Sequence, residues 1–135
     1  GDGEDAVISH VFIGANDLTR AAAFYGPIME VFGCPLKFVD EERGWAVWTS
    51  PNGARPFVIV GRPFDGAATP GNGAMTALLA PSRAAVDEAY ALALQNGGAD
   101  QGPPGLRPQY HPDYYGAYVR DPEGAKLCFV THAPE

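Results

Sequence analysis

VRDPEGAK, residues 119–126, repeats the order of WTSPNGAR, residues 48–55, after a shift of 71 residues along the chain. Each segment holds a proline, a glycine two residues later and a basic residue two residues after that. A Pro-x-Gly turn between apolar runs predicts a β-hairpin. Because two such hairpins occur at a fixed separation, the pattern indicates a duplicated chain.

A second correspondence lies upstream of these turns. A shift of 65 residues aligns ISHVFI, residues 8–13, with GAMTAL, residues 73–78. The same shift aligns Tyr25 with Tyr90 and Gly33 with Gly98. Few residues are identical, but their order and spacing agree, and we interpret the chain as two copies of one unit.

Each copy begins with a short apolar strand, predicted at Val7–Gly14 in the first copy and at Ala74–Ala80 in the second. A polar residue suited to an N-cap follows, and apolar residues then recur at a spacing of three to four. This periodicity predicts helices over Leu18–Phe32 and Arg83–Asn96, each followed by a glycine that favours helix termination.

Three further strands complete each copy. In the first copy they are predicted at Leu36–Glu41, Trp45–Thr49 and Phe57–Val60. In the second copy two of them are predicted at Tyr114–Arg120 and Lys126–Thr131. The remaining strand is expected within residues 99–111, although the proline-rich residues 101–108 cannot lie in the middle of a sheet.

These elements predict one α+β domain made of two βαβββ modules. We expect a flexible tail at residues 1–6, a first module at 7–61, a linker at 62–72 and a second module at 73–135. A chain of 135 residues is long enough to bury a core without disulfides. Cys34 and Cys128 are too few for a disulfide framework, which favours a reducing cytoplasm.

The order of these elements resembles the vicinal oxygen chelate superfamily, which includes glyoxalases, bleomycin-resistance proteins and extradiol dioxygenases. The resemblance extends from Val7 to His132 and includes ISHV at residues 8–11, AFY at 23–25 and DPEGAKL at 121–127. YHPDYY, residues 110–115, is similar to a bacterial glyoxalase-like subgroup. The resemblance implies an incomplete eight-stranded barrel with helices outside, a ligand inside a cup, and a homodimer.

The resemblance also implies four inward positions that usually hold metal ligands, two histidines and two glutamates. The two shifts place these positions at His10, Phe57, Met75 and Cys128. A catalytic metal needs about three protein ligands, and phenylalanine and methionine do not supply them. We therefore expect no cofactor. If a divalent metal binds, His10 and Cys128 are its candidate ligands.

Other candidate residues of the cup leave alternatives open. Tyr118 lies where similar fosfomycin-resistance proteins carry an inward aromatic hydroxyl, and Trp45 can add a second aromatic wall, although both can be core residues. His111, among prolines and tyrosines, can gate the cup, act as an acid or base, or pack a loop. Cys128 is either an apolar filler or a nucleophile.

The formal net charge of −7 disfavours nucleic acid as a partner and is compatible with a cationic or aromatic ligand. The acidic run Asp40-Glu41-Glu42 is either a solvated turn or a rim that attracts cations. No apolar run is long enough to span a membrane, and the first residues do not resemble a signal peptide.

Three functions are consistent with these features. The first is a metal-independent small-molecule binder, similar to bleomycin-resistance proteins. The second is a metal-dependent glyoxalase-like lyase or isomerase, or a dioxygenase, with an atypical site. The third is a non-enzymatic interaction module whose cup is filled by Phe57 and Met75.

Overall fold

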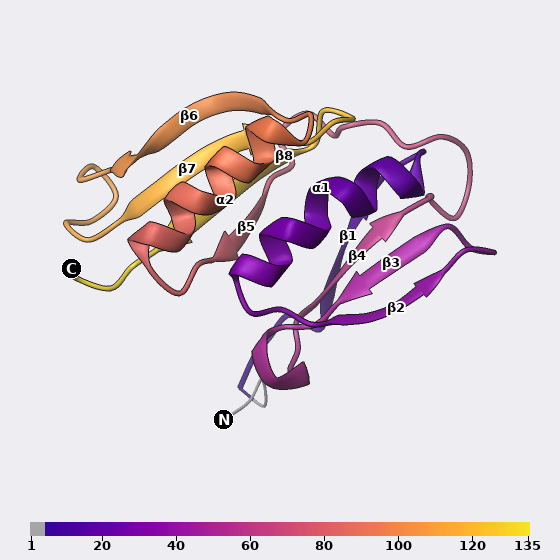
Figure 1. Ribbon diagram of the computed structural model, residues 1–135, viewed down its shortest axis with the longest axis horizontal. Helices are drawn as coiled ribbons and strands as arrows, with labels where there is room; N and C mark the ends of the chain where they lie inside the picture. The colour runs from indigo at the N-terminus through magenta and orange to yellow at the C-terminus, as the bar shows by residue number, and fades with distance from the viewer. Residues whose placement is uncertain (1–4) are drawn as a thin grey trace.

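The computed structural model describes residues 5–135 and shows two βαβββ modules in sequence (Figure 1). The first module consists of β1 (His10–Gly14), α1 (Leu18–Val31), β2 (Leu36–Asp40), β3 (Trp45–Trp48), a 3-10 turn (Pro51–Gly53) and β4 (Phe57–Gly61). The second consists of β5 (Thr76–Leu79), α2 (Arg83–Gln95), β6 (Ala99–Leu106), β7 (Tyr115–Arg120) and β8 (Lys126–Thr131). The tail predicted at residues 1–6 lies mostly outside the described residues.

The two modules share one sheet topology. The strand orders are β1-β4-β3-β2 and β5-β8-β7-β6. In both sheets the first strand of the module pairs in parallel with the last strand, and the other pairs are antiparallel. The α+β class is therefore confirmed, and the eight strands of residues 5–135 form two open sheets without closing into a barrel.

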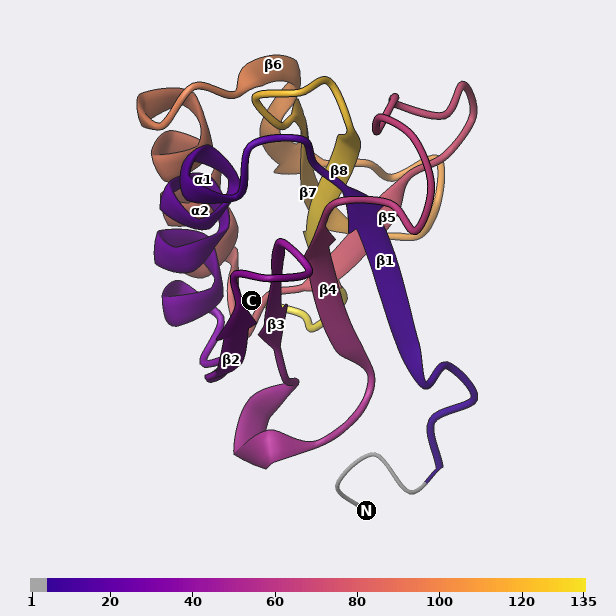
Figure 2. The same ribbon diagram turned by 90° about the vertical axis from the view of Figure 1, so that its right-hand side faces the viewer.

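Both helices cover the same side of the sheets, as Figures 1 and 2 show. The two N-caps predicted for them are present, because Asp17 accepts a hydrogen bond from the Arg20 N–H at 3.0 Å and Ser82 from the Ala85 N–H at 3.1 Å. The hydrophobic core lies between helices and sheets and contains Phe24, Tyr25, Ile28, Val60, Val86, Leu127 and Phe129. We call the opposite side of each sheet its open face.

The turn between β7 and β8 of the second module forms hydrogen bonds with the first module. The carboxylate of Asp121 accepts a hydrogen bond from the buried Tyr25 hydroxyl at 2.6 Å. Glu123 accepts bonds from the N–H groups of Asn16 and Asp17 at 2.8 and 3.0 Å. The acidic turn therefore binds the start and the middle of α1, which positions the two modules against each other.

The proline-rich segment of the second module forms β6, the strand that the sequence pattern did not locate. The strand order places β6 at the edge of its sheet. Its pairing with β7 shifts register between Asp100 and Gly102 and again between Gly102 and Gly105. An edge strand with bulges tolerates proline because its outer N–H groups need no partner. Among the described residues, neither helix is long and apolar enough to cross a membrane.

Candidate functional site

The open face of the first module contains a cavity of about 640 Å³. The lining residues come from β1, β3, β4 and the linker, and they are His10, Phe12, Gly14, Trp45, Ile59, Pro63, Phe64, Ala67, Ala68 and Thr69. The rings of Phe12 and Trp45 pack edge to face with centroids 5.6 Å apart. The Trp45 indole N–H donates to the Arg62 carbonyl at 2.9 Å, which fixes the ring orientation. The cavity therefore has a rigid aromatic wall.

His10 is the one titratable side chain that lines this cavity. Its Nδ1 lies 2.9 Å from the Ser9 hydroxyl, and the residue is solvent-exposed. Phe57 is directly opposite His10 in the β1–β4 pairing but does not line the cavity. The Arg55 guanidinium and the Lys37 ammonium lie over the Phe57 ring, 4.1 and 5.4 Å from its centroid.

The strand register corrects one of the predicted equivalences. Ala15 donates to the Gly61 carbonyl in the first module, and Ala80 donates to the Val130 carbonyl in the second. Matching these two bonds makes Ile59, and not Phe57, the counterpart of Cys128. The reason is turn length: Trp48 pairs with Val58 across the first turn, whereas Val119 pairs with Leu127 across the second. The first turn is two residues longer, so the shift of 71 residues no longer applies in the following strand.

The open face of the second module carries a hydrogen-bonded cluster of two tyrosines and a cysteine. The Tyr114 hydroxyl lies 2.8 Å from the Tyr118 hydroxyl and 3.5 Å from the Cys128 sulfur. Cys128 is fully buried, and burial raises the pKa of its thiol, opposed by the Tyr114 and Tyr118 hydroxyls and by the charges of Arg107 and Lys126. Burial also raises the pKa of both tyrosines, so they are neutral hydrogen-bonding groups at neutral pH.

His111 lies beside the second-module cluster and does not line the first-module cavity. Its Nδ1 accepts the Asp113 N–H at 3.1 Å, and its Nε2 lies 2.8 Å from Nδ1 of His132. Since Nδ1 of His111 is an acceptor, Nε2 carries the proton and donates to His132. The His111 ring also packs against Tyr114, with centroids 5.6 Å apart. This arrangement fits the loop-packing interpretation of His111.

A family model described as the Glyoxalase/Bleomycin resistance protein/Dioxygenase superfamily matches residues 7–129. The chain belongs to this superfamily. The match covers both βαβββ modules up to the last strand. No curated protein matches the chain.

Solved structures agree with this membership of the glyoxalase superfamily. A glyoxalase/bleomycin resistance protein from Albidiferax ferrireducens T118 is 31% identical, with a TM-score of 0.82 over 93% of this chain and 98% of that chain. A glyoxalase-related enzyme from Fulvimarina pelagi is 21% identical, with a TM-score of 0.69 over 93% of this chain and 87% of that chain. A family enzyme from Burkholderia phytofirmans PsJN is 19% identical, with a TM-score of 0.65 over 93% and 98%. The last two similarities show the fold.

Metal-binding members of the glyoxalase superfamily need a set of oxygen and nitrogen ligands, which the four matching positions of this chain do not supply. His10, Ile59, Met75 and Cys128 include one imidazole and one buried thiol. Among residues 5–135, no group of three or more His, Cys, Asp and Glu side chains is arranged to hold a metal ion. The donor set therefore does not fit a divalent metal.

The structure separates the predicted site residues into five places, one of which is Phe57 beneath Arg55 and Lys37. His10 and Trp45 line the first-module cavity. Tyr118 and Cys128 belong to the second-module cluster, which also includes Tyr114. His111 pairs with His132.

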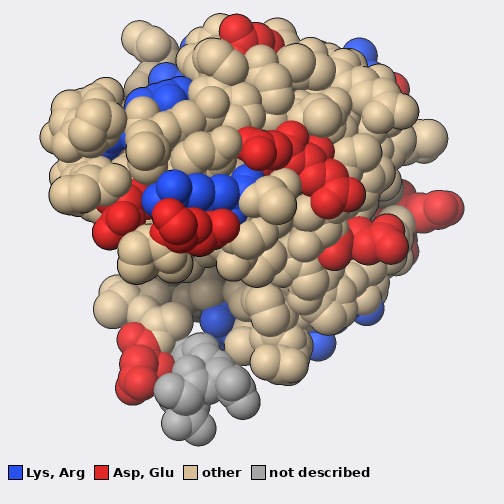
Figure 3. Space-filling model, turned by 60° about the vertical axis from the view of Figure 1, so that its left-hand side comes forward, with Lys and Arg blue, Asp and Glu red and all other residues tan. Residues whose placement is uncertain are grey.

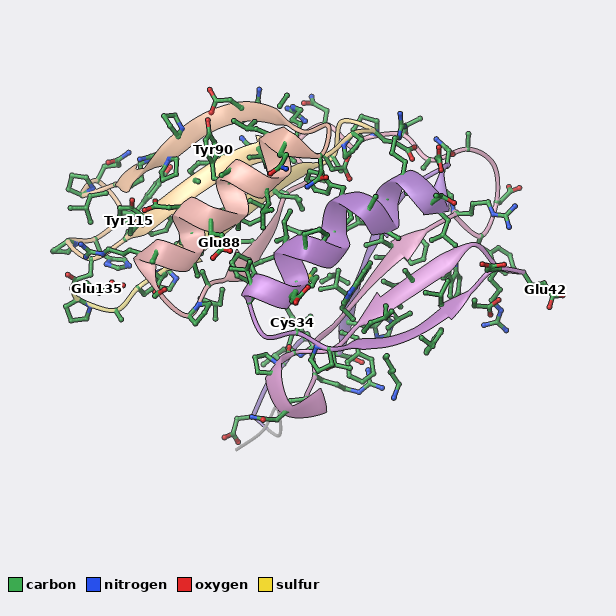
Figure 4. All side chains as sticks on the ribbon, viewed as in Figure 1. Cys34, Glu42, Glu88, Tyr90, Tyr115 and Glu135 are labelled. Carbon is green, nitrogen blue, oxygen red and sulfur yellow. The ribbon has the colours of Figure 1, made fainter. Side chains whose placement is uncertain are left out.

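Met75 lines a further cavity beside the linker. Cys34 follows α1, outside all of these places (Figure 4). Phe12 and Tyr114 were missed as site residues, although each lies an even number of residues from a predicted one, His10 and Tyr118, and so shares its strand face.

Proposed function

We propose that this glyoxalase-superfamily protein binds an organic small molecule in the first-module cavity without a catalytic metal. The observation that carries the proposal is the cavity itself, about 640 Å³ with aromatic and aliphatic walls and one imidazole. Ligand sites in proteins have this size and this combination of apolar walls with few polar groups. A ligand with a flat apolar part fits such a wall by stacking.

In this proposal each side of the cavity has a different role in binding. Phe12 and Trp45 form the stacking surface, and the bond from Trp45 to Arg62 keeps that surface in place without a ligand. His10 supplies one directional hydrogen bond, and its contact with Ser9 restrains the ring. A preorganised wall of this kind reduces the entropy lost on binding. This supports sequestration of a ligand and does not require chemistry on it.

We further propose that a second copy covers part of the open faces in a homodimer. Large apolar side chains are exposed there, namely Phe12 at 43%, Met75 at 45% and Leu79 at 69%. Phe12 and Met75 also line one small cavity, and contiguous exposed apolar surface indicates a protein interface or a ligand site. Light scattering coupled to size-exclusion chromatography is expected to give twice the chain mass, and a monomer would contradict the proposal.

The test of ligand binding is a thermal-shift screen with flat aromatic compounds of differing charge, followed by mass spectrometry of the recovered compounds. We expect at least one compound to raise the melting temperature and to be recovered unchanged. Trp45→Ala removes the wall and should abolish that shift. Tyr110→Ala is the matched control, because Tyr110 is an exposed aromatic residue that does not line the cavity.

Metal analysis of chelator-free protein distinguishes this proposal from the enzymatic alternative. We expect no stoichiometric divalent metal. Zinc, iron or nickel at one ion per chain that is lost in His10→Ala would overturn the metal-independent proposal. A compound that is chemically converted during the screen would overturn the proposal that the protein only sequesters its ligand.

A further inference from the structure

A pair of basic residues faces each other without a counter-charge on the open face of the second module. Arg120 and Lys126 are directly opposite in the β7–β8 pairing. Side chains opposed in this way lie close together, and like charges there are destabilising. Among residues 5–135, neither one forms an ion pair with a carboxylate. Their equivalents across the first turn, Thr49 and Phe57, carry no charge.

The nearest acidic residues in the sequence do not neutralise this pair. Asp121 accepts from the Tyr25 hydroxyl and from the N–H groups of Glu123 and Ala125, so its oxygens are committed to α1 and to the turn. Glu123 is bound to the start of α1. Acidic side chains cover more of the face drawn in Figure 3 than basic ones. The chain is acidic overall, with a net charge of −7, yet no ion pair among residues 5–135 compensates the two positive charges.

A cavity lies next to the pair. It has a volume of about 550 Å³ and is lined by Arg120, Lys126 and residues 70–75 of the chain between the modules. Among residues 5–135, no carboxylate lines it. Pro70 closes one side against the turn, since a Cβ on Gly124 would lie 3.3 Å from the Pro70 ring. This cavity shares no residue with the first-module cavity.

The two cations are partly fixed before any ligand arrives. Arg120 donates from Nη1 to the Gly124 carbonyl at 2.9 Å, which restrains the guanidinium and leaves its other N–H groups available. Lys126 lies with its ammonium 5.7 Å from the centroid of the Tyr118 ring. Both residues are half-buried. Half-buried and restrained cations bind oxyanions better than mobile surface ones, because less entropy is lost and solvent screening is weaker.

We propose that Arg120 and Lys126 bind a doubly charged oxyanion of the phosphoryl class in the cavity that residues 70–75 enclose. An anion with two negative charges compensates both cations and removes their repulsion. The lining of this site shares no residue with that of the first-module cavity, although a smaller cavity lined by Phe12, Met75 and Lys126 lies between the two. The acidic composition was compatible with a cationic ligand, whereas this site would bind an anion. The difference arises because the sign of the ligand's charge depends on where the basic side chains lie and not on the net charge.

The test is a calorimetric titration of the full chain with inorganic phosphate at constant ionic strength. We expect saturable binding of one phosphate per chain. Arg120→Gln and Lys126→Gln should each weaken it by about tenfold or more, as expected for the loss of a charge-assisted contact. Arg55→Gln is the matched control, because it removes the same charge from an exposed residue outside the cavity.

A second measurement uses the repulsion between the two cations. Without phosphate, Lys126→Gln should unfold at a higher denaturant concentration than the unmodified chain, since the like-charge pair is removed. With saturating phosphate the order should reverse. Absence of saturable binding, or equal weakening in Arg55→Gln, would overturn the proposal. Neither result would affect the binding of aromatic ligands in the first-module cavity, so the two proposals fail separately.

Discussion

The open faces of the two modules differ although the same backbone plan forms both. The first face has a cavity with aromatic walls and a single imidazole, while the second has two bonded phenols, a buried thiol and an unpaired cation pair. Equivalent positions carry Ile59 in one and Cys128 in the other. Duplication therefore gave two similar surfaces, and differences in side chains, in turn length and in strand register gave one an apolar and the other a polar character.

The two hairpin turns differ in the same way. The first turn is stabilised by a hydrogen bond within the turn, since the Ser50 hydroxyl donates to the Pro56 carbonyl at 2.7 Å. The second turn reaches the other module through Asp121 and Glu123. Equivalent turns thus have a local role in one module and an inter-module role in the other, which mutation can test.

The largest effect is expected for Asp121→Ala. The substitution leaves the buried Tyr25 hydroxyl and the N–H groups of Glu123 and Ala125 without their acceptor. Loss of a charged acceptor from buried donors should lower the free energy of unfolding by about 3 kcal/mol. Ser50→Ala, the equivalent change in the first turn, should cost only about 1 kcal/mol. Urea denaturation measures both.

A double-mutant cycle with Tyr25→Phe shows whether the loss arises between the modules. In the Tyr25→Phe background, Asp121→Ala should cost less, because one donor is already absent. Equal costs for Asp121→Ala and Ser50→Ala would show that the two turns do not differ as described.

A smaller effect, dependent on pH, is expected for Glu123→Gln. Burial acts to raise the pKa of Glu123, but the N–H groups of Asn16 and Asp17, the Asn16 side chain and Arg20 together lower it. A lowered pKa in the folded state contributes stability above the usual glutamate value of about 4.3, and this is lost as the pH falls through the folded value. Glu123→Gln should therefore cost about 1 kcal/mol near pH 7 and progressively less in acid.

The control for this pH dependence is Glu88→Gln. Glu88 is exposed on α2 and forms no hydrogen bond or ion pair within the described residues (Figure 4). Its substitution should change the free energy of unfolding by at most about 0.5 kcal/mol at either pH. A cost of Glu123→Gln that stays constant from neutral to acidic pH would contradict a role for the ionised carboxylate.

The sequence was sufficient for the repeated architecture because its signals are local. Helix periodicity, N-caps and Pro-x-Gly turns act over a few residues, and they were enough to predict the α+β class with two βαβββ modules. The position of β6 required the sheet order, since only an edge strand accepts its prolines. The match of Phe57 to Cys128 failed because the turns align by proline and glycine, while hydrogen-bond register is set by the number of residues between paired strands.

The candidate site was less accessible from sequence because it depends on contacts between distant residues. Period-two alternation indicates that Tyr118 shares a face with Tyr114, the residue just before β7, but it does not reveal their bond or the burial of Cys128. The net charge of the chain likewise does not tell where on the surface its charged side chains lie. A value of −7 suggests attraction of cations, whereas the opposed pair of Arg120 and Lys126 concentrates positive charge at one cavity.

The last comparison concerns thiol reactivity at the equivalent positions 59 and 128. Cys128 is fully buried and burial raises the pKa of its thiol, so it should react slowly with a disulfide reagent at pH 7. In a chain carrying Cys34→Ser and Cys128→Ser, the thiol introduced by Ile59→Cys should react about tenfold faster or more, since Ile59 lines an open cavity.

Tyr114→Ala sharpens this comparison by removing the side chain whose hydroxyl contacts the Cys128 sulfur. In the Cys34→Ser background it should bring the Cys128 rate toward that of the first-module thiol, at a cost in stability of about 1–3 kcal/mol. Tyr110→Ala removes an exposed ring that packs on Tyr114 with centroids 4.9 Å apart, keeps the Tyr114 contact with the Cys128 sulfur, and should change the rate much less. A Cys128 that reacts as fast as the Ile59→Cys thiol without any substitution of Tyr114 would mean that the two open faces are equally accessible. Their difference would then be one of charge and not of shape.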